Sequence, residues 1–337
     1  MVSIKDVAEA CGVSASTVSK ALNNHSDVSE NKKQQIRNVA KEMGYSPSSS
    51  ARMLKTNRSH NIGILFVEES HSGLTHYYFS SILDSFREHL ERKGYDLTFI
   101  VSGKNKFGGM TFLEHSRYRR FDGVMIACVE FDNNDVQNLM KSDIPTVIID
   151  YVYNNTMSIL SDNVKGMTML TQYAIDLGHR RIAYLHGEKS LVTSQRLSGY
   201  YVTMDKNGIH VPEEYVHGIR YRSMEDAAIF TKELLKLKEP PTCILYPDDY
   251  ACFGGINVLR ELGYEIGKDI SIAGYDGMPI ARQVQPVITT VIQDTVNIGR
   301  RAAEKLVQLV ENPRTTIVEQ ITVECNLFKG ETIARIN

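Results

Sequence analysis

The sequence lacks the features that mark an exported, membrane-embedded or disulfide-stabilised protein. Its five cysteines form no CxxC pair and no disulfide framework, so each is expected to pack as a small buried side chain in a reducing cytosol. No apolar run approaches the roughly 18 residues that would suggest a membrane span. The first residues, MVSIKDVAEA, are charged and helical, unlike a signal peptide. These absences predict a cytoplasmic protein.

Motifs of catalysis and metal binding are missing as well. The chain contains no GxGxxG, Walker loop, GxSxG or HExxH pattern. We therefore expect neither an enzyme nor a bound metal or cofactor. A plain solute-binding protein is a second alternative, but it would carry a signal peptide and no basic N-terminal segment.

The charges that are present are unevenly distributed. The chain of 337 residues has a net charge of −2 and is long enough for two or three compact units. Residues 1–58 hold nine Lys/Arg against five Asp/Glu, a net of +4, which leaves 29 against 35 in the remainder, a net of −6. A basic head on an acidic body is expected of a nucleic-acid-binding module joined to a separate partner domain.

Three short amphipathic helices are predicted in the first 46 residues. Ser3 followed by Asp6 resembles a capping box at the start of the first helix, Ser14 suits the N-cap of the second, and Gly12 and Gly44 suit helix ends. The second helix leaves one face to small hydroxyls, a lysine and an amide, which suits a partner that offers hydrogen bonds and negative charge. Two short helices joined by a glycine-containing turn are typical of a helix-turn-helix. The apolar stripes are Ile4, Val7, Ala8 and Cys11; Val18, Ala21 and Leu22; and Ile36, Val39, Ala40 and Met43.

From Ile62 onward, apolar runs such as IGILFV, GVMIAC, TVIID and ISIAGYD alternate with helical periodicity. This alternation predicts parallel sheets covered by helices on both faces, and its length predicts two Rossmann-like lobes. Ligands of such sheets bind at the carboxyl ends of strands. The polar residues that follow predicted strands are therefore candidates for ligand contact, namely Asp150, Asp248, Asp249 and Asp276.

The stretches SIKDVAEACGVSASTVSKALNN and VSENKKQQIRNVAKEMGYSP closely resemble the helix-turn-helix head of the LacI/GalR family of bacterial transcription regulators. The resemblance implies a recognition helix from Ser14 to Asn24 that lies in the major groove of DNA. In that alignment Ala15, Ser16 and Lys20 stand where the family reads base edges. The residues suited to phosphate contacts are Ser3, Ser14, Thr17, Ser19 and Asn23.

The segment SPSSSARMLKTNRS follows the head, and its serines and Pro47 suggest a linker. In the family the matching stretch folds into a hinge helix only when two copies meet on DNA, and its leucine wedges into the minor groove. Leu54 occupies that position, and Arg52 and Lys55 flank it.

The remainder resembles the family's periplasmic-binding-protein-like sensor, through SDNVKGMTML, LGHRRIAYLHG, PDDYACFGGINVLRELG and DISIAGYDGMPIA. In LGHRR, Gly178 and His179 are expected to be structural, as a helix C-cap. Asp248 and Asp276 are equally suited to capping helices. The effector contacts that the resemblance implies are Asp150, Arg196, Asp249 and Asp276, with Tyr221 as a stacking aromatic and Tyr77, Tyr78 and Phe79 lining the cleft.

The predicted fold is a small all-α helix-turn-helix head joined to a two-lobed α/β sensor of the type I periplasmic-binding-protein-like class. The predicted domains are 1–46 for DNA binding, 47–60 for the hinge, and 61–337 for effector binding and dimerisation. The predicted function is a homodimeric, effector-responsive repressor of carbohydrate genes that binds a pseudo-palindromic operator. Carboxylates, arginine and aromatics suit a sugar effector. Two alternatives remain: a phosphorylated carrier protein as the partner, and a nucleoside or purine as the effector.

Overall fold

A computed structural model describes residues 2–46, 58–67, 73–101 and 109–336. The chain divides into two compact units, Met1–His60 and Asn61–Asn337. We call these units the head and the sensor. The predicted hinge contacts Arg52, Leu54 and Lys55 lie outside the described residues.

The head contains the three predicted helices, α1 (Ile4–Ala10), α2 (Ala15–Leu22) and α3 (Glu30–Glu42). Ser3 and Asp6 form the predicted capping box, and Ser14 caps α2 by accepting a hydrogen bond from the Thr17 N–H. The three apolar stripes meet in one core. Its fully or nearly fully buried members are Val7, Ala8, Cys11, Val18, Ala21, Val28, Ile36 and Ala40.

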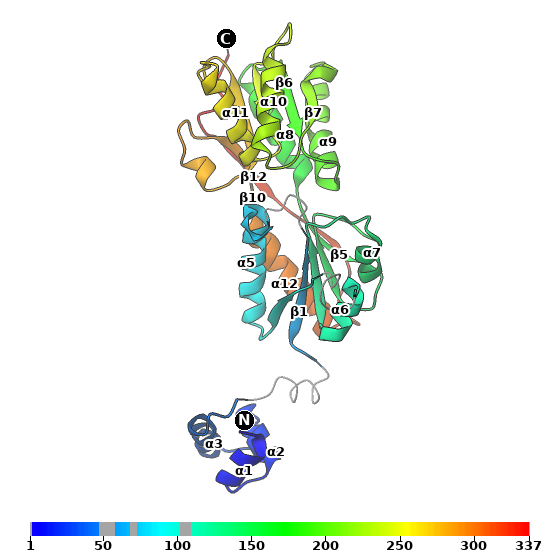
Figure 1. Cartoon of the computed structure of the whole chain (residues 1–337), viewed down its shortest axis with the longest axis vertical. Helices are drawn as coiled ribbons and strands as arrows, with labels where there is room; N and C mark the ends of the chain where they lie inside the picture. Colours follow the sequence, from blue (N-terminus) through cyan, green and yellow to red (C-terminus); the bar gives the residue numbers. More distant parts are fainter. Residues whose placement is uncertain (1, 47–57, 68–72, 102–108, 337) are drawn as a thin grey trace. The chain divides into compact units, whose positions relative to one another are not determined.

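The sensor consists of two lobes, each built on a six-stranded sheet. In the N-terminal lobe the strand order is β11-β5-β4-β3-β1-β2, and every neighbouring pair is parallel. Helices α5 and α12 cover one face and α6 and α7 the other (Figure 1). The strands are β1 (Asn61–Phe66), β2 (Asp96–Phe99), β3 (Gly123–Ala127), β4 (Thr146–Ile149), β5 (Met157–Ser161) and β11 (Gln320–Val323). The helices are α5 (Tyr77–Glu91), α6 (Phe112–Arg119), α7 (Asn134–Met140) and α12 (Thr295–Glu311).

The C-terminal lobe has the order β12-β10-β9-β8-β6-β7. Helices α8 and α9 pack on one face of this sheet and α10 and α11 on the other. Its strands are β6 (Ile182–His186), β7 (Val216–Gly218), β8 (Cys243–Leu245), β9 (Ser271–Asp276), β10 (Thr289–Gln293) and β12 (Cys325–Phe328). Its helices are α8 (Asn163–Asp176), α9 (Leu191–Lys206), α10 (Met224–Leu235) and α11 (Asp249–Glu261).

One strand departs from the predicted parallel arrangement. Strand β12 pairs antiparallel with β10, and Cys325 at its start lies opposite Gln293 at the end of β10. Only Glu324 separates β11 from β12. The chain therefore runs almost straight from one sheet into the other, and it enters the second sheet at the carboxyl ends of the parallel strands.

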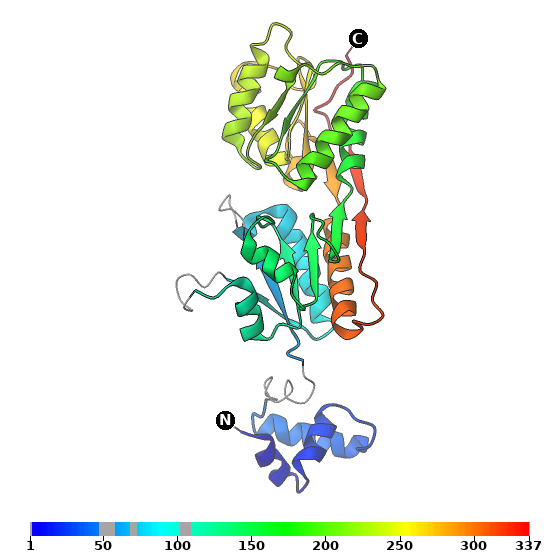
Figure 2. The same cartoon turned by 90° about the vertical axis from the view of Figure 1, so that its right-hand side faces the viewer.

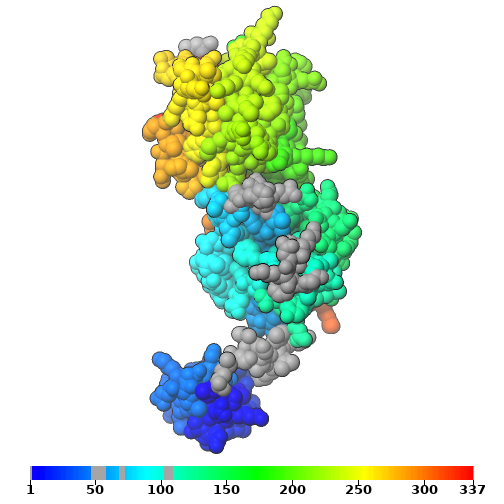
Figure 3. Space-filling model, viewed as in Figure 1, coloured from blue at the N-terminus to red at the C-terminus, as the bar shows by residue number. Residues whose placement is uncertain are grey.

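The chain passes between the lobes at three places: after β5, after β10 and after β11. Figure 2 shows β11 and β12, in red, running from one lobe to the other beside the green segment that includes β5, and the colours of Figure 3 distinguish the two lobes on one face. Each lobe is thus assembled from segments that are distant in the sequence. None of the described helices is long and apolar enough to cross a membrane.

His179 fastens the end of the chain to the C-terminal lobe, in the structural role that the sequence predicted. Its ring is fully buried after α8, close to Gly178, whose φ is +99°. One ring nitrogen lies 2.9 Å from the hydroxyl of Thr242, and the other lies 3.0 Å from the carbonyl oxygen of Ala334. Burial lowers the pKa of this imidazole.

His179→Ala should therefore lower the free energy of unfolding of the sensor by about 2–4 kcal/mol. The substitution removes two buried hydrogen bonds and leaves a cavity. Urea denaturation of the full chain measures the loss. His210→Ala, at an exposed histidine of the same lobe, is the matched control and should change the free energy of unfolding little.

The difference in unfolding free energy between wild type and His179→Ala should also depend on pH. Because the folded state lowers the pKa of His179, only the unfolded chain takes up this proton as pH falls through about 6.5. The stability difference between wild type and His179→Ala should accordingly shrink from pH 7.5 to pH 5.5. A constant or growing difference would contradict burial of a neutral ring.

Candidate functional site

The outer surface of α2 carries most of the residues that the sequence assigned to DNA contact. Ser14, Ser16 and Asn23 are exposed, and Thr17 and Ser19 are partly exposed. The Ser14 hydroxyl also lies 2.9 Å from the hydroxyl of Thr17, and the Asn23 amide donates a hydrogen bond to the carbonyl oxygen of Ser19. These groups form a continuous hydrogen-bonding surface along the helix, which suits phosphates and base edges.

Three other DNA-contact candidates already have partners within the head. Ser3 accepts and donates hydrogen bonds in the capping box of α1. Ala15 packs partly against the head core, which limits its reach toward a base. The Lys20 ammonium forms an ion pair with Asp27 at 2.5 Å. Helical periodicity could not predict this ion pair, because Asp27 lies in the loop that follows α2.

In the sensor, the N-terminal lobe contributes a tyrosine and a carboxylate. Tyr78, in the first turn of α5, donates a hydrogen bond of 2.5 Å to Asp150, which follows β4 with a φ of +56°. The other Asp150 oxygen accepts from the Ser161 N–H at 3.1 Å. Burial raises the pKa of Asp150, and burial together with the Asp150 charge raises the pKa of Tyr78.

The C-terminal lobe contributes Arg196 from α9, whose side chain is almost fully buried. Its Nε donates to the Asn163 side chain and its Nη1 to the Pro247 carbonyl oxygen, each at 2.8 Å. The guanidinium lies 3.6 Å from the centre of the Tyr275 ring, and Nη2 lies 3.8 Å from an Asp276 oxygen. Arg196 thus joins the start of α8, the loop before α11 and the end of β9.

Asp276 ends β9 beside this guanidinium, in a backbone conformation that is rare for a residue with a side chain. Its φ is +97°, and one carboxylate oxygen accepts a hydrogen bond of 2.7 Å from the Gln293 amide. Burial raises the pKa of Asp276 to about 6, although Arg196 opposes the shift. Asp276 therefore changes charge close to neutral pH, and it caps no helix.

Asp248 and Tyr221 complete the group. Asp248 is the N-cap of α11 and also accepts a hydrogen bond of 2.7 Å from the Arg222 N–H. Burial raises the pKa of Asp248, and the nearby Arg196 charge opposes the rise. The Tyr221 hydroxyl lies 2.8 Å from that of Thr193. We call Tyr78, Asp150, Arg196, Tyr221, Asp248 and Asp276 the carboxylate–arginine cluster.

The structure does not bring Asp249 into this cluster, so its predicted role needs correction. Asp249 is fully buried, and its two oxygens accept hydrogen bonds of 2.7 Å from the Thr290 hydroxyl and the Met278 N–H. Its carboxylate is used to hold the turn after β9. Asp248 precedes α11 as its N-cap with an extended backbone, whereas Asp249 is the first residue of the helix. The two side chains therefore diverge, and Asp248 lies close to Arg196 while Asp249 faces the sheet.

The aromatic residues that begin α5 also separate. Phe79 packs into the core of the N-terminal lobe, with its ring centre 5.7 Å from that of Phe66. Tyr77 instead packs against the apolar cluster of the C-terminal lobe. Of the three residues predicted to line a cleft, only Tyr78 belongs to the cluster, through its hydrogen bond to Asp150.

Four buried polar atoms on residues near the cluster lack a hydrogen-bond partner in the described structure. They are Ser161 Oγ, the Tyr184 hydroxyl, the Tyr275 hydroxyl and Gln293 Oε1. Ser161 and Gln293 end β5 and β10, and each also hydrogen-bonds to a cluster carboxylate. Buried polar groups are nearly always satisfied, so these atoms suit a polar ligand. The position of Ser161 and Gln293 at strand ends could have identified them as candidates in the sequence, whereas nothing in the sequence distinguished Tyr184.

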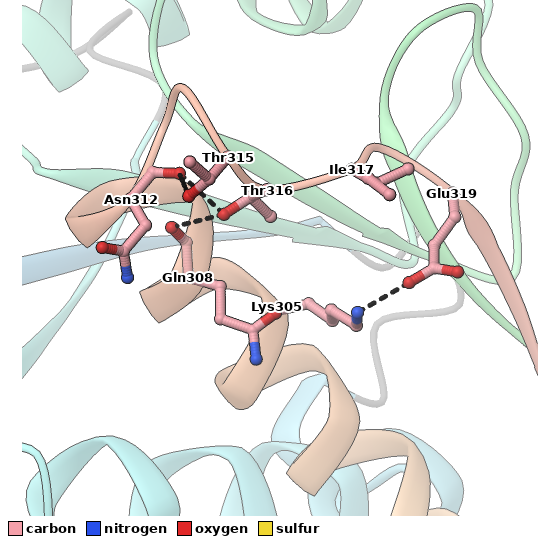
Figure 4. A pocket seen from close by; sticks show the side chains of 7 residues that line it. All are labelled: Lys305, Gln308, Asn312, Thr315, Thr316, Ile317 and Glu319. Carbon is pink, nitrogen blue, oxygen red and sulfur yellow. Dashed lines mark hydrogen bonds and ion pairs between the residues drawn. The ribbon is translucent and has the colours of Figure 1, made fainter.

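A separate hollow lies near the C-terminal end of α12 (Figure 4). The Thr316 hydroxyl donates to the Gln308 and Asn312 carbonyl oxygens there, and Lys305 pairs with Glu319 at 2.6 Å. These contacts cap the helix and fasten the segment that leads to β11. The lining includes no member of the cluster, so this hollow is not a candidate for effector binding.

Comparisons with known proteins agree with both units. Residues 3–48 match the family model of bacterial regulatory proteins of the lacI family, and residues 171–333 match that of a periplasmic binding protein-like domain. The chain is 31% identical to the HTH-type transcriptional repressor PurR of Mannheimia succiniciproducens over 316 residues, which cover 92% of each chain.

Solved structures agree in fold. The lac repressor dimer bound to operator and the anti-inducer ONPF has a TM-score of 0.83 at 24% identity and covers 99% of both chains. The transcriptional regulator CelR in complex with cellobiose has a TM-score of 0.71 at 23% identity and covers 98% of this chain and 100% of its own. The predicted fold class is confirmed. The chain belongs to the LacI family of bacterial regulatory proteins, and it is a ligand-responsive, DNA-binding transcriptional regulator.

Proposed function

We propose that this regulator is a cytoplasmic homodimeric repressor of carbohydrate-utilisation genes, and that its effector is a neutral sugar. In this proposal residues 1–46 bind a pseudo-palindromic operator, 47–60 form the hinge, and 61–337 bind the effector and dimerise. The observation that carries the effector assignment is the carboxylate–arginine cluster, with its buried or partly buried carboxylates and unpartnered polar atoms.

The charges of the cluster favour an effector without negative charge. Asp150, Asp248 and Asp276 supply three carboxylates around the Arg196 guanidinium, which already has protein partners. A ligand anion at about 5 Å from an ionised carboxylate would be repelled by roughly 3 kcal/mol at an effective dielectric constant near 20. Uronic acids and sugar phosphates are therefore disfavoured, and hydroxyl groups, which both donate and accept, suit these carboxylates and the unpartnered atoms.

Substitution of Arg196 is a poor test of effector binding, although the residue lies at the centre of the cluster. Its removal would leave the Asn163 side chain and the Pro247 carbonyl oxygen without their partner, and Asp276 without its nearest cation. Breaking a buried charge pair is strongly destabilising, so Arg196→Ala would mix misfolding with lost affinity. Tyr221 and Asp276 offer cleaner tests. Asp276→Asn leaves Asp150 and Asp248 to offset the Arg196 charge. The Asn oxygen can still accept the hydrogen bond from Gln293.

A thermal-shift screen of the full chain should find stabilisation by a neutral mono- or disaccharide. The uronic acid and phosphorylated forms of the same sugar should bind at least about a hundredfold more weakly, since repulsion of roughly 3 kcal/mol corresponds to that factor. Nucleosides are included because a nucleoside effector is one of the two alternatives to a sugar. A larger shift with an anionic sugar or a nucleoside would contradict the proposal.

The location of the site is tested with two tyrosine variants. Tyr221→Ala should weaken binding of the sugar found in that screen by about tenfold or more, because it removes an aromatic surface in the cluster. Tyr118→Ala, at a tyrosine that is 66% exposed, is the matched control and should leave the affinity unchanged. Equal affinities of wild type and Tyr221→Ala would place the sugar elsewhere.

Asp276→Asn should stabilise the unliganded protein at pH 7.5 and weaken sugar binding by about tenfold or more. The folded state raises the pKa of Asp276 from 3.8 to about 6, so the ionised carboxylate destabilises the fold above pH 6. Removing that charge should add about 1–3 kcal/mol to the free energy of unfolding. Asn also tolerates a positive φ better than most residues.

The sign of the pH effect checks this interpretation. As pH falls through 6 toward 4, Asp276 becomes protonated in the folded wild type, so the advantage of Asp276→Asn should shrink. Asp205→Asn, at an exposed carboxylate of α9, is the control. A variant that is less stable than wild type at pH 7.5 would show that the Asp276 charge is needed for folding.

A dimer is expected in solution. Light scattering of the full chain at micromolar concentration should give twice the 38.0 kDa mass of one chain. A tetramer or a monomer would contradict the proposed assembly.

A further inference from the structure

The ion pair between Lys20 and Asp27 lies on the recognition side of the head. Lys20 is the only charged residue of α2, and its Nζ is 2.5 Å from an Asp27 oxygen. Both side chains remain about half exposed, at 44% and 50%. The hydrogen bond from Lys20 lowers the pKa of Asp27, so the carboxylate is ionised at neutral pH. The pair therefore places a negative charge beside the one cation of the helix.

The loop that carries Asp27 is anchored at both ends. Asn24 has a φ of +60°, and its side-chain oxygen accepts a hydrogen bond of 3.2 Å from Arg37 of α3. The His25 N–H donates to the Lys20 carbonyl oxygen at 3.0 Å, and Val28, next to Asp27, is buried in the head core. The position of the carboxylate is thus set by the fold of the head, although the ion pair itself is accessible to water.

This pair matters because the three-helix part of the head carries little excess charge. Residues 2–46 contain six Lys/Arg and five Asp/Glu, so the larger basic excess of the first 58 residues comes from the segment after residue 46. Sequence-independent affinity for DNA comes mainly from the contacts of cations with phosphates. A carboxylate that occupies Lys20 removes one such contact from any DNA that the head meets.

We infer that Asp27 is a specificity-determining residue, which holds Lys20 away from phosphates and yields it to a correctly placed acceptor on a base edge. On non-operator DNA, Lys20 stays paired and the Asp27 charge repels the backbone. On the operator, an acceptor such as guanine N7 or O6 replaces the carboxylate as the partner of the ammonium. The inference rests on the proposed position of Lys20 at base edges.

The test compares Asp27→Asn with wild type in the full chain. The DNA probes are sites selected by the wild-type protein from duplexes with a randomised pseudo-palindrome, and a duplex of scrambled sequence. Asp27→Asn should bind the scrambled duplex about three- to tenfold more tightly, and its affinity should fall more steeply with salt, by about one more released counterion per head. Affinity for the selected sites should change less than threefold, so the ratio of the two affinities falls.

Glu30→Gln is the matched control. It removes the same charge three residues away, but its partner is Lys33 of α3, a lysine with a buried side chain. If Glu30→Gln lowers the affinity ratio as much as Asp27→Asn does, or if Asp27→Asn raises both affinities equally, Asp27 is a general repelling charge and the inference is overturned. Thermal melting of each variant verifies that the head and sensor remain folded.

Lys20→Ala separates the inference from its premise. Sequencing of the selected DNA should show that Lys20→Ala and Asp27→Asn relax the base preference at the same symmetric pair of positions, and that the double variant relaxes it no further. If Lys20→Ala leaves every preference intact, the position of Lys20 at base edges is wrong. If Lys20→Ala relaxes a preference and Asp27→Asn does not, the position holds and the role of Asp27 is wrong.

Discussion

Burial of one guanidinium is the constraint on which the sensor's functional region depends. Arg196 is removed from water, and a charge in that environment needs both hydrogen bonds and opposite charges. The Asn163 side chain and the Pro247 carbonyl oxygen supply the bonds, and Asp276 supplies the nearest charge. These partners come from three different elements, so the position of Arg196 fixes how those elements meet.

Arg196 has enough partners to offset its burial, but the carboxylates around it do not. There are more of them than one guanidinium can neutralise, and burial raises the pKa of Asp150, Asp248 and Asp276. The charge of Arg196 therefore does not offset the whole cost of burying these carboxylates. Under the proposed function, a ligand that donates hydrogen bonds to them would stabilise their ionised forms and would favour the arrangement of the lobes in which the ligand is held.

Those parts of the structure that depend on neighbouring residues could be predicted from the sequence. The three helices of the head, the Ser3–Asp6 capping box and the alternation of strands and helices follow from local periodicity and capping. The sequence could not predict that Asp248, rather than Asp249, belongs to the carboxylate–arginine cluster, because this depends on how the start of α11 is placed against the sheet. Gln293 and Tyr184 were missed for a related reason: their polar atoms become significant only where the fold leaves them without partners.

The three passages of the chain between the lobes have a consequence for synthesis of the protein. The N-terminal lobe lacks α12 and β11, and the C-terminal lobe lacks β10 and β12, until residues 289–328 have been made. Neither lobe corresponds to a continuous stretch of sequence, so neither can complete its sheet while the chain is still growing through its first four-fifths. The head, which is local in sequence, has no such requirement and is free to fold as soon as it leaves the ribosome. The unit that binds DNA is therefore finished well before the unit that controls it.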